Sequence, residues 1–69
     1  MKGTIKSLDR KGYGIIQASD GSKFPFLFVD VISRRVLVAG ERVIFSIRTV
    51  QDKVFAENIS YDAQMDKII

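Results

Sequence analysis

Hydrophobic and polar residues alternate along most of this chain, a pattern typical of strands with one buried face. Turn residues interrupt it at short intervals, and Ser19-Asp20-Gly21-Ser22 is the strongest hairpin signal because Asp-Gly tolerates a positive φ. Strands are predicted over residues 3–8, 13–17, 23–29, 42–49 and 54–60. The longer connection 30–39 is predicted to contain a helical turn at Val31-Ile32-Ser33. Short strands with these turns indicate a small all-β barrel or sandwich.

Period-two spacing divides each predicted strand into two faces. In the third strand Phe24, Phe26 and Phe28 share one side, while Pro25 and Leu27 take the other. The inward residues of all strands form the predicted core: Ile5, Ile16, Phe24, Phe26, Val31, Val43, Phe45, Ile47 and Ile59. The opposite, outer face is predicted to carry Lys6, Tyr13, Ile15, Pro25, Leu27 and Arg48. That face is unusually apolar for a surface that meets only water.

Composition limits both the fold and the chemistry. The chain has 69 residues, enough for one domain, and contains neither cysteine nor histidine. Disulfides and thiolate or imidazole metal sites are therefore excluded, and a hydrophobic share of 46% with five phenylalanines supplies the core instead. The commonest catalytic bases and nucleophiles are also missing, and no phosphate-binding loop motif is present. We expect no enzyme activity, no catalytic residues, no cofactor and no metal.

The charge distribution favours an anionic partner. Eleven Lys and Arg against eight Asp and Glu give a net charge of +3, and ten of the eleven cations lie in the first 53 residues. No apolar run approaches the roughly 18 residues of a membrane span, and the amino terminus shows no signal-peptide pattern. We therefore expect a cytoplasmic location.

Two runs combine rings, glycines and cations. Lys11-Gly12-Tyr13-Gly14-Ile15-Ile16 is predicted to begin the second strand, and Phe24-Pro25-Phe26-Leu27-Phe28 forms the third. Sheet faces that present aromatic and basic side chains are how small barrels hold single-stranded nucleic acid. We expect the Tyr13 ring to be exposed on such a face, surrounded by cations.

These runs resemble the cold-shock domain, a five-stranded antiparallel oligonucleotide-binding (OB) barrel. The first run matches that family's Lys-Gly-(Phe/Tyr)-Gly-Phe-Ile motif at five of six places, and Gly3-x-Ile5-Lys6 is similar to its opening Gly-x-Val-Lys. Further matches in the same order are Leu37, Gly40, Val43 and Phe45, then Ala56-x-Asn58-Ile59. The resemblance covers residues 1–60 and implies a cold-shock-like OB barrel there. Residues 61–69 are left as a C-terminal extension that could form one or two helical turns.

The departures from the family fall on its base-stacking positions. Ser7 stands where the family has Trp, and Ile15 stands where it has Phe. Pro25 and Leu27 stand where it has an outward Phe and His. Stacking contributes about 1–3 kcal/mol per base, so these replacements predict weak binding.

The leading interpretation is low-specificity binding of single-stranded RNA or DNA, in the manner of an RNA chaperone, as the resemblance implies. Bases would lie on the apolar residues of the outer face and phosphates on the cations around it. Phe28 fits either interface or core, because its parity matches the core phenylalanines. The predicted nucleic-acid-binding residues are Lys6, Arg10, Lys11, Tyr13, Ile15, Leu27, Phe28, Arg34, Arg35, Arg48 and Lys53. The alternative is an OB module that has lost this activity and uses its apolar outer face for a protein partner or a weak homodimer.

Overall fold

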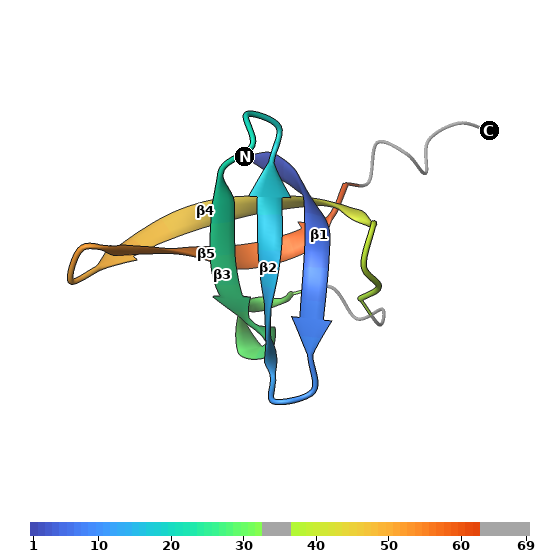
Figure 1. Cartoon of the computed structure of the whole chain (residues 1–69), viewed down its shortest axis with the longest axis horizontal. Coiled ribbons are helices and arrows are strands. Elements are labelled where there is room, and N and C mark those ends of the chain that lie inside the picture. Colours follow the sequence, from blue (N-terminus) through green and yellow to red (C-terminus); the bar gives the residue numbers. More distant parts are fainter. Residues whose placement is uncertain (33–36, 63–69) are drawn as a thin grey trace.

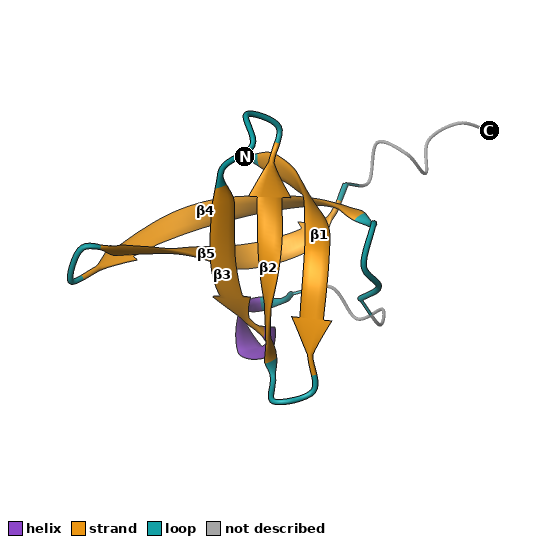
Figure 2. Cartoon of the chain, in the orientation of Figure 1, coloured by secondary structure: helices purple, strands orange, loops and turns teal. Residues whose placement is uncertain are grey.

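The strands close into a single barrel. The computed structural model describes residues 1–32 and 37–62, and within these ranges the chain forms five strands and one short 3-10 helix (Figures 1 and 2). The strands are β1 (Lys2–Asp9), β2 (Tyr13–Ala18), β3 (Lys23–Leu27), β4 (Arg42–Val50) and β5 (Lys53–Tyr61). Their order around the barrel is β1-β2-β3-β5-β4, with β4 pairing back to β1. The predicted all-β OB barrel is confirmed.

Most neighbouring strands in the barrel are antiparallel. The exception is the pairing of β3 with β5, which is parallel and is made through Phe26 and Ala56. The chain reaches β5 from β3 through the 3-10 helix η1 (Phe28–Asp30) and β4. This crossover closes the sheet and leaves the β1–β2–β3 meander as one continuous outer surface.

The helical turn lies earlier than the sequence predicts. It spans Phe28–Asp30, whereas Val31 forms a parallel bridge with Ile59 and Ser33 lies outside the described residues. The Phe28 N–H donates to the Gly12 carbonyl at 2.9 Å, and the Phe28 carbonyl accepts from Val31 N–H at 3.1 Å. The second bond closes the 3-10 turn, and β3 ends at Leu27, two residues before the predicted end of the strand.

All of the predicted core residues except Ile47 lie in the core or at its margin, and the core also contains Ala18 and Ala56, which were not predicted. Ile5, Ile16, Phe26, Val43, Phe45, Ala56 and Ile59 are at most 2% exposed, and Ala18 is also buried. The predicted core residues Phe24 and Val31 pack at its margin. Ile47 was expected inside but is 45% exposed. β1 pairs with β4 only as far as Ile44, so the rest of β4 runs with β5 beyond the barrel (Figure 1).

Two irregularities bend the sheet. The β1–β2 register shifts between Ile5 and Ser7, which leaves Lys6 as the extra residue of a bulge. The β4–β5 register shifts between Ile44 and Ser46, and there Asn58 of β5 has a φ of 52°. Bulges increase local twist and bend a strand, as closure of a small barrel requires.

Gly14 lies where no side chain fits. A Cβ built on it would be 2.6 Å from the Ser7 carbonyl oxygen and 2.8 Å from atoms of the Phe26 ring. Gly12 has a different reason to be glycine, because its φ is +103° in the β1–β2 turn. Both glycines of the motif are therefore needed by the barrel itself.

Replacing Gly14 by alanine is expected to destabilise the barrel by about 1–3 kcal/mol, because an added methyl group must displace the Ser7 backbone or the Phe26 ring. Urea unfolding followed by circular dichroism measures the change. Ser19→Ala, in an exposed turn, serves as the control and should stay within about 0.5 kcal/mol of the wild type. Equal unfolding midpoints for Gly14→Ala and the wild type would contradict the close approach.

Candidate nucleic-acid interface

The outer face of β1, β2 and β3 is organised in rows that cross the three strands. Each β2 residue in these rows pairs with one residue of β1 and with one residue of β3. Residues that lie directly opposite each other point to the same face of the sheet. We name each row by its β2 residue. The tyrosine, isoleucine and glutamine rows are Asp9–Tyr13–Leu27, Ser7–Ile15–Pro25 and Thr4–Gln17–Lys23.

The tyrosine row presents an apolar platform. Tyr13 is 43% exposed and Leu27, its partner on β3, is 45% exposed. Phe28 follows Leu27, and its N–H bond to Gly12 holds it beside the turn that precedes Tyr13. The expected exposure of the tyrosine ring is confirmed.

Phe28 contacts the core and is also exposed at the outer face, the two positions that the sequence left open for it. Its ring stacks on that of Phe26, with centroids 6.1 Å apart and planes at 25°, yet the residue is 40% exposed. The inner ring therefore supports the outer one. A half-exposed ring backed by a buried ring is a rigid surface for stacking.

A carboxylate lies beside the phenol, so the expectation that only cations surround Tyr13 was wrong. The negative charge of Asp9 raises the pKa of Tyr13 above its ordinary value, and hydrogen bonding between the two side chains acts in the same direction. The Asp9 Oδ1 also accepts the Lys11 N–H at 2.8 Å, which fixes the turn. Asp9 was not expected at this face because it falls between the first two predicted strands.

The predicted cations that the structure describes fall into two sets, one on β1 and its turn to β2 and one on β4 and β5. Lys6, Arg10 and Lys11 are exposed in β1 and in the β1–β2 turn. Arg48 and Lys53 lie on the β4–β5 extension, whose turn is far from the β1–β2 turn (Figure 1). Arg48 also forms an ion pair with Glu57 at 3.7 Å. The predicted contacts Arg34 and Arg35 lie outside the described residues.

The isoleucine row joins the platform to the rest of the face. Ile15 is half-buried between Ser7 and Pro25, which are both exposed. A base resting on this row would meet aliphatic carbon and no aromatic ring. The departures from the family therefore change only surface chemistry, and the neighbouring Gly14 and Ile16 stay buried.

Replacing Asp9 by asparagine should lower the pKa of Tyr13 toward the ordinary value of about 10, because the charge that disfavours the phenolate is removed. Asparagine keeps an acceptor for the Lys11 N–H. NMR titration of the Tyr13 ring gives the value separately from Tyr61. Asp20→Asn is the matched control, since Asp20 Oδ1 accepts the Ser22 N–H at 2.9 Å in a distant turn. An unchanged Tyr13 pKa in Asp9→Asn would contradict the assigned cause.

Comparison with known proteins places the chain in a family. Residues 1–61 match the family model described as the "'Cold-shock' DNA-binding domain". The chain belongs to the cold-shock domain family. Cold-shock domains bind single-stranded nucleic acids, so this activity is supported for the chain at the level of the family.

Solved structures give the same fold for this cold-shock domain. Matches are found to 29 chains, among them the structure titled "drosophila Unr CSD456". That chain is 23% identical with a TM-score of 0.73, and the match covers 87% of this chain and 25% of that one. This chain therefore spans a quarter of the length of that one. No curated protein matches the sequence. In the described part of the chain, no helix is long and apolar enough to cross a membrane.

Proposed function

We propose that this cold-shock domain binds single-stranded RNA or DNA weakly and with little base preference, as an RNA chaperone does. The observation that carries the proposal is the exposed Tyr13 ring on the tyrosine row, flanked by Leu27 and Phe28. Every base has a π-face and can stack on such a ring, which gives binding that tolerates any sequence.

The proposed mode divides the work between two sets of side chains. Bases lie on Tyr13 and Phe28, and on the aliphatic surfaces of Ile15 and Leu27. Phosphates are held by the cations that adjoin this surface, Lys6, Arg10 and Lys11. Such contacts release counterions, so affinity falls as salt rises.

Low affinity follows from what the platform lacks. Four family stacking positions hold Ser7, Ile15, Pro25 and Leu27, which offer less contact area and no π-face. Each lost stack removes about 1–3 kcal/mol. The Asp9 carboxylate beside Tyr13 adds repulsion toward phosphate. A strand held this loosely is released easily, as a chaperone of RNA requires.

Replacing Tyr13 by alanine should cost about 1–3 kcal/mol of binding free energy, because one stacked base is lost. Anisotropy of a labelled oligothymidylate or oligouridylate at low salt measures it. Tyr13→Phe keeps the ring and is the matched control, with affinity close to that of the wild type. Saturable binding that Tyr13→Ala leaves intact would rule out this platform.

Replacing Ser7 by tryptophan should tighten binding, because it adds a ring to the exposed isoleucine row beside Ile15. A single added stack of about 1–3 kcal/mol corresponds to roughly five- to 150-fold in affinity. Ser7→Leu is the control, since it adds apolar area without a π-face and should gain less. The idea fails if the two variants bind oligouridylate equally.

A second candidate is a protein-interaction module. The observation that favours it is the exposure of aliphatic side chains just past β3, with Val29 at 85% and Ile32 at 65%. Sedimentation velocity at rising protein concentration separates the two functions. Absence of oligonucleotide binding at low salt, together with a rising sedimentation coefficient, would favour this candidate over the first.

A further inference from the structure

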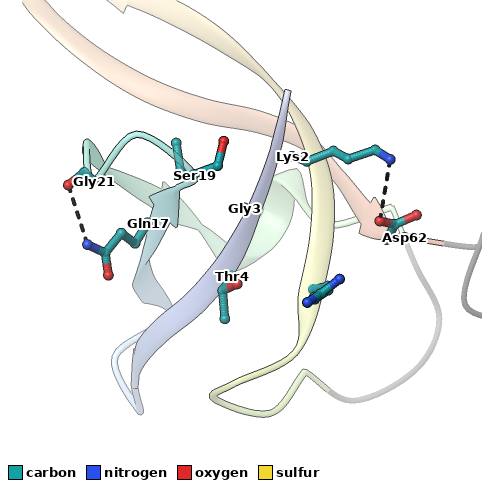
Figure 3. A pocket seen from close by; sticks show the side chains of 9 residues that line it. Lys2, Gly3, Thr4, Gln17, Ser19, Gly21 and Asp62 are labelled. Carbon is teal, nitrogen blue, oxygen red and sulfur yellow. Dashed lines mark hydrogen bonds and ion pairs between the residues drawn. The ribbon is translucent and has the colours of Figure 1, made fainter.

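A second feature of the outer face is a hollow away from Tyr13. It has a volume of ≈ 780 Å³, and its lining includes the polar side chains of Lys2, Thr4, Gln17, Arg42 and Asp62. Figure 3 shows Gln17 on one side of β1 and the Lys2–Asp62 pair on the other. The hollow thus straddles β1.

Register makes the hollow continuous with the glutamine row. Thr4 pairs with Gln17 of β2 on one side and with Arg42 of β4 on the other. The row therefore extends as Lys23–Gln17–Thr4–Arg42 across four strands, with a cation at each end and neutral hydrogen-bonding groups between them. This arrangement suits an anion with several oxygens better than a flat base.

The two cations of the hollow differ in their ion pairs. Lys2 Nζ lies 3.8 Å from Asp62 Oδ2. Arg42 is exposed, and no described residue forms an ion pair with it. Among the described residues that line the hollow, none is aromatic, so none offers a ring on which a base could stack. Its chemistry is that of a phosphate contact, with Arg42 as the available charge.

The hollow lies on the path of a strand that starts on Tyr13. Gln17 is four residues beyond Tyr13 on β2 and on the same face, a distance of roughly 13 Å at about 3.3 Å per residue. Arg42 lies two strands from Gln17, about 10 Å at about 4.8 Å per strand, so a chain that rises about 3.4 Å per nucleotide needs about five nucleotides to reach from Tyr13 to Arg42.

We propose that the hollow is a phosphate subsite for single strands longer than about four nucleotides. Arg42, supported by Lys2, holds the backbone there while the bases lie on the tyrosine row. The inference rests on the proposed function and adds to it a direction, along β2 toward the start of β4. It also assigns a role to cations that lie outside the predicted binding set.

A length series tests the subsite. Arg42→Ala should weaken binding of an octanucleotide about two- to fivefold, the range of an exposed ion pair, and leave a trinucleotide unaffected. The slope of log affinity against log salt should fall by about 0.7 for the octanucleotide alone. Arg42→Lys keeps the charge and should restore most of the affinity. Equal effects of Arg42→Ala on both lengths, or none on either, would overturn the proposal.

A variant of opposite sign strengthens the test. Asp62→Asn removes the carboxylate beside Lys2, so octanucleotide binding should tighten while trinucleotide binding stays the same. Circular dichroism melting of each variant shows that the barrel is intact. A loss of octanucleotide affinity in folded Asp62→Asn would contradict the subsite.

Tyr13→Ala separates the two levels of the argument. It should weaken both lengths if the platform binds bases. If Tyr13→Ala changes neither length, the proposed function fails. If Tyr13→Ala weakens both and Arg42→Ala weakens neither, only the subsite fails.

Discussion

The close approach of three strands at Gly14 is the constraint on which the interface depends. With no Cβ at this position, the Ser7 carbonyl of β1 and the Phe26 ring of β3 both come against the β2 backbone. Because Gly14 faces inward, its neighbours Tyr13 and Ile15 must face outward. Two residues earlier on the same segment, the Gly12 carbonyl accepts the Phe28 N–H and holds Phe28 beside Tyr13. The packing around Gly14 inside the barrel thus determines that Tyr13 and Ile15 lie on its outer face.

Features that depend on the local alternation of hydrophobic and polar residues could be predicted from the sequence. Features that depend on where the strands end could not. The strands and most of the core follow from period-two spacing and turn residues. Ile47 obeys that spacing and shares a face with buried Ala56, yet it is exposed because β4 and β5 continue beyond the other strands. The helical turn was misplaced by three residues because two backbone bonds of Phe28 decide it. The strand lengths and the bond from Phe28 to Gly12 both depend on segments that are distant in the sequence.

The platform itself was predictable from the motif, but its electrostatics were not. Tyr13, Ile15 and Leu27 share a face by alternation alone. The neighbour of Tyr13 on β1 depends on the bulge at Lys6: the pairing of Ile5 with Ile16, continued without a shift, would bring Leu8 opposite Tyr13. The extra residue brings Asp9 there instead, and with it a carboxylate at the phenol. One inserted residue therefore sets the charge next to the ring.

The core and the candidate interface lie on opposite faces of the sheet, which explains how outer side chains can be substituted without loss of the barrel. The core uses one face of β1, β2 and β3, and the candidate interface uses the other, so Ser7 and Pro25 contribute little to the buried cluster. In the proposed mode of binding, fewer rings leave a larger share to phosphate contacts, which are weak individually and add along the strand. Cations far from the platform then gain importance. On this face, further cations lie toward the Gln17 end of β2. They are Lys23, Arg42 and Lys2, next to neutral polar groups.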